Sequence, residues 1–217
     1  MRKNIAIDGP AGAGKSTIAK IVAKRLGHIY VDTGAMYRAM ALFMLKQGVD
    51  VNDTEAVKKS AKDANIEIRY EDGIQCVILN GENVNDSIRT EEVSAAASKT
   101  SVVKEVRERL VALQQELALK TDVVMDGRDI GTKVLPDAYL KIYMTASADV
   151  RAKRRYDENI AKGMECDLEK IKQEIIERDH RDMTREESPL VKAWDAVEID
   201  TSGMTIEEVA DRITKML

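Results

Sequence analysis

Short apolar runs recur along the chain and alternate with longer segments of helical period. Five of these runs have the length and composition of buried strands, and helical patterns separate most of them. The five runs are residues 4–8, 28–32, 123–126, 140–144 and 196–200. This alternation predicts an α/β fold with a five-stranded parallel sheet that is flanked by helices on both faces.

One region departs from the alternation of strands and helices. Residues 66–71 alternate between apolar and polar, and residues 74–80 are again rich in β-formers. The Asp-Gly pair between them favours a two-residue hairpin turn, because these residues tolerate the positive φ angles that such a turn needs. Pairing across the turn sets Ile68 opposite Val77. We therefore predict a small antiparallel insert at about 62–90.

Composition and charge limit the class of protein. The 217 residues are 44% apolar and 33% charged, which is typical of a globular protein, and the net charge is −4 with no basic tail. Binding to nucleic acid through its phosphates is therefore not expected.

No apolar run approaches the ~18 residues of a membrane span, and the first strand begins too early for a signal peptide. Cys76 and Cys166 lie far apart, which favours inert thiols. We expect a cytoplasmic monomer without a membrane partner.

A glycine-rich segment between the first predicted strand and a helix carries the clearest chemistry. The segment, Gly9-Pro10-Ala11-Gly12-Ala13-Gly14-Lys15-Ser16, fits Gly-x-x-x-x-Gly-Lys-Ser/Thr in full. Backbone N–H groups and the positive end of the helix cradle phosphates, and Lys15 adds a charge for the β- and γ-phosphates. The Ser16 hydroxyl can ligate Mg²⁺, with Asp126 close behind it. The motif predicts binding of a nucleoside triphosphate; a glycine turn needed only for packing is the weaker alternative.

This loop alone does not name a reaction, because it serves switches, motors and kinases alike. A guanine-specificity motif is missing: residues 119–122 lack the amide or hydroxyl at their first position. Arginines and acids instead follow two predicted strands, at residues 32–38 and 126–132, on the sheet edge where ligands bind. A third group, residues 176–185, sets Arg178, Asp182 and Arg185 at i, i+4 and i+7, so we expect them on one helical face.

Clustered arginines at a ligand-binding edge indicate phosphoryl transfer. The donor and acceptor phosphates are both negative, and arginine forks neutralise several oxygens at fixed geometry. Two alternatives stay open on the residues alone. One is a small-molecule kinase with another acceptor, and the other is a nucleotide-dependent switch that binds without fast transfer.

Five ordered motifs resemble those of the bacterial cytidylate kinases, which belong to the nucleoside monophosphate kinases. They are GPAGAGKST, VDTGAMYR, ASKTSVVKEVR, MDGRDIGT and ERDHRDMTR, and the resemblance runs from about residue 3 to the C-terminus. It implies a P-loop kinase that uses ATP·Mg²⁺ to phosphorylate CMP and dCMP. It also implies a core (about 1–30, 91–146 and 191–217), a monophosphate-binding lobe (about 31–90) that carries the antiparallel insert, and a helical lid (about 147–190).

The resemblance further implies a role for individual residues. Lys15, Arg128 and Arg185 would act in catalysis. ATP would be bound by Gly9, Pro10, Ala11, Gly12, Ala13, Gly14, Lys15, Ser16, Thr17 and Arg154, with Arg151 and Arg155 as alternatives in the lid. CMP would be bound by Thr33, Arg38, Ser98, Arg107, Arg128, Asp129, Arg178, Asp182 and Arg185. Of these, Ser98, Arg107 and Asp129 would read the cytosine, and Arg178 and Asp182 would reach the ribose. Mg²⁺ would be held by Ser16, with Asp126 beyond it.

Overall fold

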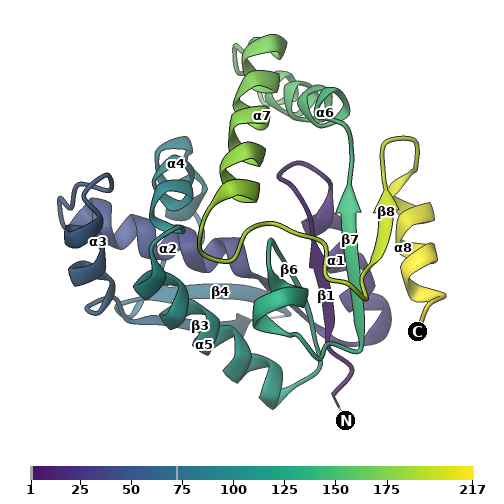
Figure 1. Cartoon of the computed structure of the whole chain (residues 1–217), viewed down its shortest axis with the longest axis horizontal. Helices are drawn as coiled ribbons and strands as arrows, with labels where there is room; N and C mark the ends of the chain where they lie inside the picture. Colours follow the sequence, from purple (N-terminus) through teal and green to yellow (C-terminus); the bar gives the residue numbers. More distant parts are fainter. Residues whose placement is uncertain (1, 72) are drawn as a thin grey trace.

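The computed structural model of the chain describes residues 2–71 and 73–217 (Figure 1). Its strands are β1 (Ile5–Asp8), β2 (Ile29–Asp32), β3 (Ile66–Glu71), β4 (Ile74–Leu79), β5 (Glu82–Asn83), β6 (Val123–Gly127), β7 (Leu140–Thr145) and β8 (Val197–Asp200). Its helices are α1 (Lys15–Leu26), α2 (Thr33–Lys46), α3 (Thr54–Ala61), α4 (Glu91–Thr100), α5 (Lys104–Lys120), α6 (Ala148–Ala161), α7 (Leu168–Thr184) and α8 (Ile206–Thr214). Two short turns of helix are η1 (Ser87–Arg89) and η2 (Ile130–Val134).

The main sheet has five strands in the order β2-β6-β1-β7-β8, and all the pairs are parallel. This confirms the predicted parallel sheet. β1 is the central strand, and its last residue, Asp8, is level with Gly127 of β6 and Tyr143 of β7. The carboxyl ends of all five strands therefore lie at one edge, which is the upper edge of the sheet in Figure 1.

Both faces of this sheet are buried, which explains why the strands read as continuous apolar runs. Neighbouring residues of β1 enter different clusters because successive side chains of a strand point to opposite faces. Ile5 and Ile7 pack with α1 and α8, whereas Ala6 packs with Met125 and Ile130 on the face that α5 and η2 cover. All five side chains are at most 1% exposed.

The predicted insert is present as a second, antiparallel sheet of β3, β4 and β5. Ile68 pairs with Val77, as the sequence predicts, and Ile66 pairs with Leu79. In the predicted Asp-Gly turn, Asp72 lies outside the described residues. In Figure 1 this sheet runs across the direction of the main strands.

The segment from α3 to α4 (residues 54–100), here called the side lobe, shares one apolar core with α2. Every fourth residue of α2 is a methionine that contributes to this core: Met36, Met40 and Met44 are 0% exposed and pack with residues of β3, β4 and α4. Methionine suits such a junction because its flexible side chain fills irregular gaps. The side lobe is thus packed on α2, which itself begins directly at the carboxyl end of β2.

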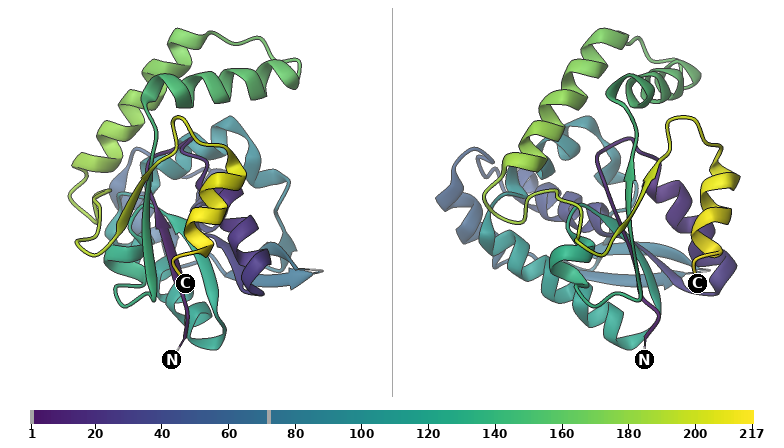
Figure 2. Two further views of the ribbon diagram at one scale, coloured as in Figure 1. Left: turned by 90° about the vertical axis from the view of Figure 1, so that its right-hand side faces the viewer. Right: turned by 45° about the vertical axis from the view of Figure 1, so that its right-hand side comes forward.

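Helices α6 and α7, here called the arm, stand above the carboxyl edge of the main sheet in both views of Figure 2. Arg151 of α6 fixes the base of the arm. Its guanidinium forms an ion pair with Asp179 of α7 at 2.6 Å and donates a hydrogen bond to the carbonyl of Ala11 at 3.0 Å. The arm is therefore joined directly to the glycine-rich loop.

The structure agrees with the expectation that Arg178, Asp182 and Arg185 share one helical face, because all three line the smaller of two clefts at the end of α7. α7 ends at Thr184, and Arg185 is extended, with φ −61° and ψ 141°. The chain turns there because the Arg185 Nε donates to the carbonyl of Ser188 at 2.7 Å. Arg185 is the C-cap of α7, and its N–H still donates to the carbonyl of Arg181 at 3.1 Å.

Two simple expectations can be compared directly with the structure. Cys76 and Cys166 are both free. Across residues 2–71 and 73–217, helices that combine the length and the apolar character of a membrane span are lacking.

The end of β1 approaches β7 so closely that only glycine fits at position 9. Gly9 has φ +145°, and a Cβ there would lie 1.9 Å from the carbonyl oxygen of Met144. We predict that Gly9→Ala lowers the free energy of unfolding by about 3–5 kcal/mol through strain and overpacking. The control is Gly27→Ala, where φ is +67° but a Cβ meets no atom within 4 Å; it should cost about 1–2 kcal/mol. Equal losses in urea unfolding would contradict this account.

Candidate active site

Two clefts open at the carboxyl edge of the main sheet. The larger, of about 1140 Å³, lies between the glycine-rich loop, the arm, the side lobe and the segment that leads into α8. The smaller, of about 380 Å³, lies between the ends of β2 and β6, the side lobe and the end of α7. Lys15 and Ser16 line both clefts, so the two spaces meet at the start of α1.

The glycine-rich loop leaves the N-terminus of α1 open. Gly12 and Gly14 have φ angles of +78° and +85°, and Gly14 caps α1 without a side chain. The first N–H groups of a helix lack partners within the helix and carry the positive end of its dipole, which favours an anion. Residues from Gly12 to Thr17 line the larger cleft. Gly9 shapes the turn and Pro10 supplies a carbonyl, but neither lines a cleft.

Lys15 is held inside the loop. Its side chain is buried, and its Nζ donates to the carbonyl of Pro10 at 2.7 Å. Burial and the positive charge of Arg128 lower the pKa of Lys15, whereas Asp126 and Asp8 act in the opposite sense. A phosphate placed beside this ammonium group would raise the pKa again, because an opposite charge stabilises the protonated form.

Asp126 ends β6 directly behind Ser16. Its carboxylate accepts hydrogen bonds from the hydroxyls of Ser16 and Tyr30, both at 2.8 Å. Burial and the neighbouring Asp32 raise the pKa of Asp126, and Lys15 opposes this. Over the part of the chain that is described, no group of three or more His, Cys, Asp or Glu side chains is arranged to hold a metal. A cation at this edge would therefore need oxygens from its own ligand as well as from Ser16.

Positive charge dominates the smaller cleft. Eight cationic side chains line it against four carboxylates. The cations are Lys15, Lys20, Arg38, Arg89, Arg107, Arg128, Arg178 and Arg185, and the acids are Asp32, Asp126, Asp129 and Asp182. Such an excess inside a cleft favours a polyanionic ligand.

Most of these arginines are held in place by a carboxylate. Arg38 pairs with Asp32 at 3.0 Å, and Arg128 pairs with Asp182 at 2.8 Å. Although burial opposes it, Arg128 holds the pKa of Asp182 below its ordinary value. Thr33, beside them, donates its hydroxyl to the carbonyl of Asp126 at 2.7 Å.

Arg178 and Arg185 each have a hydrogen-bond donor that no protein group accepts within the described ranges. Within the described ranges, the Nε of Arg178 and the Nη2 of Arg185 are buried without a hydrogen-bond partner. Burial and Arg128 lower the pKa of Arg178 to about 10, and burial and Arg107 lower that of Arg185. Unsatisfied buried donors are costly, so these two arginines are arranged for acceptor oxygens that a ligand can supply.

The far end of the smaller cleft is a buried ion pair. Arg107 of α5 donates to the carboxylate of Asp129 and, through its other Nη, to the carbonyl of Ser101 at 3.1 Å. The guanidinium lies over the ring of Tyr37, 5.5 Å from its centroid. Ser98 lines both clefts. This end presents carboxylate, guanidinium and hydroxyl groups side by side. The carboxylate can accept from a donor on a flat ring, and the guanidinium and the hydroxyl can donate to acceptors on the same ring.

The three arginines of the arm differ in their contacts. Arg151 is buried and engaged in the ion pair with Asp179, so it acts as a structural link. Arg154 donates to the carbonyl of Thr201 at 2.7 Å and lines the larger cleft. Arg155 lies at the same cleft with only a long ion pair to Glu174, at 3.9 Å.

Some residues of the site escaped the sequence analysis. Asp8 lies beneath the site and fixes the loop after β6: its two carboxylate oxygens accept the N–H groups of Ile130 and Gly131 at 2.8 and 2.7 Å. Tyr37 was passed over although it stands next to Arg38 in a motif. Arg89 has no motif of its own, and only the tertiary structure brings it to the clefts.

Known proteins resemble this chain over its whole length. A family model described as cytidylate kinase matches residues 5–217. The chain belongs to the cytidylate kinase family. Curated cytidylate kinases of a Geobacillus species (strain WCH70) and of Bacillus cereus are 53% and 51% identical to it, over 100% of this chain and 98% and 96% of theirs. That of Caldicellulosiruptor saccharolyticus is 52% identical over 98% of this chain and 94% of its own length.

Solved structures support the fold of this cytidylate kinase family member. A protein from Eubacterium ventriosum superposes with a TM-score of 0.54 at 14% identity, covering 100% of this chain and 98% of that one. Shikimate kinase from Acinetobacter baumannii, solved with shikimate, gives a TM-score of 0.50 at 16% identity, covering 100% and 93%. At these identities the likeness concerns the fold alone, which is that of P-loop kinases.

The buried Asp8 makes a prediction about pH. Burial raises the pKa of Asp8 from 3.8 to about 6, although its two N–H partners oppose this. The folded state therefore keeps a proton that the unfolded state releases, and the contribution of Asp8 to stability falls as the pH rises from about 4 to about 6. We expect the stability of the wild type relative to Asp8→Asn to fall by about 2 kcal/mol between pH 4.5 and 7.5. Urea unfolding at both pH values measures this, and a constant or rising difference would contradict it.

Proposed function

We propose that this protein transfers the γ-phosphoryl group of ATP·Mg²⁺ to the phosphate of CMP or dCMP. The P–O bond between the γ-phosphorus and the leaving ADP oxygen breaks, and a new bond forms to an oxygen of the acceptor phosphate, giving CDP or dCDP. The observation that carries the proposal is the pair of cation-lined clefts that meet at Lys15, one of which ends at the Arg107–Asp129 pair. Membership of the cytidylate kinase family supports the same reaction.

ATP is assigned to the larger cleft. Its phosphates fit the open N-terminus of α1 and the charge of Lys15, and Arg154 stands beside them on the arm. Mg²⁺ suits the edge at Ser16 and Asp126, because this ion keeps several waters and is bound through one or two protein oxygens together with substrate phosphates. Bound there, it would neutralise charge on the β- and γ-phosphates.

The acceptor phosphate is assigned to the smaller cleft, near Arg38, Arg128 and Arg185. The spare donor of Arg185 and the guanidinium of Arg38 suit phosphate oxygens. Thr33 shapes the wall beside them, since its own proton is engaged by the carbonyl of Asp126. Arg178 and Asp182 adjoin this position and suit the ribose hydroxyls.

The cytosine is assigned to the end of the cleft at Asp129 and Arg107, with Ser98 beside it. Cytosine carries an exocyclic amino group, which the carboxylate of Asp129 can accept, and it carries acceptors at N3 and O2 for Arg107 and Ser98. Uracil has a carbonyl in place of that amino group, so its carbonyl oxygen would face the carboxylate of Asp129 and neither group could donate a hydrogen bond. A buried polar mismatch of this kind costs about 1–3 kcal/mol.

No general base is needed for this reaction, because the acceptor phosphate is already an anion at neutral pH. Positioning and electrostatic stabilisation carry the catalysis, with Lys15, Arg128 and Arg185 around the transferred group. The arm stands where it can close over the larger cleft and act as a lid, which would keep water from the γ-phosphate.

An acceptor panel tests the proposal. Initial rates of ADP release with ATP·Mg²⁺ are compared for CMP, dCMP, UMP, AMP, shikimate and dephospho-coenzyme A. We expect kcat/KM to be highest for CMP and dCMP, with CDP or dCDP as product. Faster turnover of any other acceptor would contradict the cytosine assignment, and ADP release that is independent of all acceptors would favour a switch or ATPase.

Asp129→Asn should relax the choice of base. Asparagine keeps the shape of the side chain and its contact with Arg107, but its amide can turn to donate to the O4 of uracil. We expect the preference for CMP over UMP in kcat/KM to fall by about 10–100-fold, which corresponds to about 1–3 kcal/mol. The affinity for ATP, measured by calorimetry, serves as the control and should be unchanged. Full retention of the CMP preference would remove Asp129 from base recognition.

A further inference from the structure

Three cationic side chains among the described residues line both clefts: Lys15, Arg178 and Arg89. Each comes from a different part of the molecule. Lys15 belongs to the glycine-rich loop, Arg178 to α7 of the arm, and Arg89 to η1 of the side lobe. A side chain that faces both clefts lies where the two spaces join, and this is also where a group would pass from one ligand to the other.

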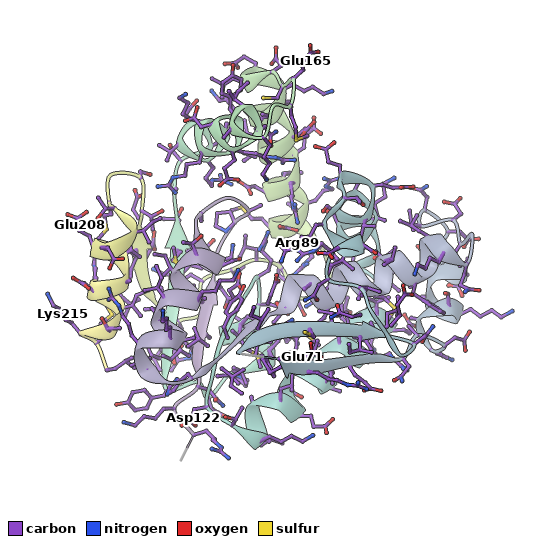
Figure 3. All side chains as sticks on the ribbon, turned by 180° about the vertical axis from the view of Figure 1, so that it is seen from behind. Glu71, Arg89, Asp122, Glu165, Glu208 and Lys215 are labelled. Carbon is purple, nitrogen blue, oxygen red and sulfur yellow. The ribbon has the colours of Figure 1, made fainter. Side chains whose placement is uncertain are left out.

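Arg89 differs in its contacts from four other arginines of the two clefts. Arg38, Arg107, Arg128 and Arg151 are each held by an aspartate, whereas the guanidinium of Arg89 is exposed and makes no hydrogen bond or ion pair with any described residue. Figure 3 labels Arg89 near the middle of the molecule, at the lower end of α7. Its charge is therefore available to a ligand without first breaking a protein contact.

The backbone that carries Arg89 is nevertheless well anchored. The preceding Ile88 is 2% exposed in the core of the side lobe, and its N–H donates to the carbonyl of Val84 at 3.0 Å. The following Thr90 caps α4 by accepting the N–H of Val93 at 3.2 Å. The Cα of Arg89 thus moves only with the side lobe, while its long side chain is free to reach into the junction.

We propose that Arg89 binds the phosphoryl group in transfer once both nucleotides are in place. The proposal rests on the function proposed above. During transfer, negative charge is spread over the three oxygens of the moving group while its bond to the ADP oxygen breaks and its bond to the CMP oxygen forms. Arg89 then adds a third charge at the junction, beside Lys15 and Arg178, to those of Arg128 and Arg185.

The origin of the three cations gives the arrangement a consequence for specificity. Lys15 is present at the donor phosphates whenever ATP is bound, but Arg89 is carried by the lobe that lies against the acceptor cleft. Arg89 is thus best placed when ligands fill both clefts, which favours transfer to CMP over transfer to water.

The test uses Arg89→Met, which keeps much of the apolar stem and removes the charge. Its matched control is Arg69→Met, at an exposed arginine of the same lobe that pairs with Glu67 at 2.9 Å. We measure kcat for CDP formation, the Kd of ATP and of CMP separately, and the Kd of adenosine and cytidine joined through five phosphates. The joined ligand occupies both clefts at once and therefore reports on the junction without turnover.

For Arg89→Met we expect kcat to fall on the order of 10²-fold, the scale of one lost donor to a developing charge. The joined ligand should bind about 10-fold more weakly or worse, in keeping with the loss of a charge-assisted hydrogen bond. ATP and CMP bound singly should keep their affinities, and Arg69→Met should behave as the wild type. A second variant, Arg89→Gln, should reproduce these losses, so the test stands if Arg89→Met folds poorly.

Two results would overturn the proposal. In the first, kcat and the affinity for the joined ligand match those of Arg69→Met, and Arg89 is then a surface arginine. In the second, CMP bound singly weakens as much as the joined ligand, and Arg89 then belongs to the acceptor cleft alone. The wild type in the same assay separates these outcomes from failure of the proposed function: no CDP from the wild type overturns the reaction itself, whatever the variants do.

Discussion

Electrostatic repulsion between two phosphorylated ligands is the constraint on which the rest of the structure depends. Two like unit charges 4 Å apart near a protein surface repel by about 4 kcal/mol, and each nucleotide brings more than one such charge. Many cationic side chains line the clefts and offset this repulsion, but these cations also repel one another. Burial lowers the pKa of Arg178, and the repulsion by Arg128 lowers it further. Carboxylates set between the arginines, such as Asp182 and Asp129, keep the cluster together.

The parallel sheet supplies the place where these charges can meet. Because β1 lies at its centre, the loop that follows β1 reaches the middle of the carboxyl edge, between the ends of β6 and β7. Asp8 ties that edge together through two backbone N–H groups, and Gly9 lets β1 end against β7 without a Cβ. The phosphate-binding loop is thus held by the most buried strand of the protein, although the loop itself is open to ligands.

The arm and the side lobe bring further charges to the same edge from two sides. The arm is linked to the glycine-rich loop through Arg151, and the side lobe is packed on α2 through methionines. Dividing the cations among three parts spreads their mutual repulsion over separate elements, each of which is held by its own packing.

The sequence by itself determined the local features of this protein. The apolar runs predicted all five strands of the main sheet, the Asp-Gly pair predicted the hairpin with its register at Ile68 and Val77, and the glycine motif located the phosphate-binding loop. These features follow from short-range patterns: the period of apolar residues, the φ angles open to glycine, and a fixed motif length. The motifs also allowed the family to be recognised.

The tertiary structure alone decided which distant residues share a site. The strand order puts β6 beside β1, and this brings Asp126 to Ser16 across 110 positions. The pairing of Arg107 with Asp129 and the position of Arg89 at both clefts are not encoded in any local pattern. Each depends on how separate elements pack, because an ion pair or a shared cleft is set by the distance between side chains in space and not along the chain.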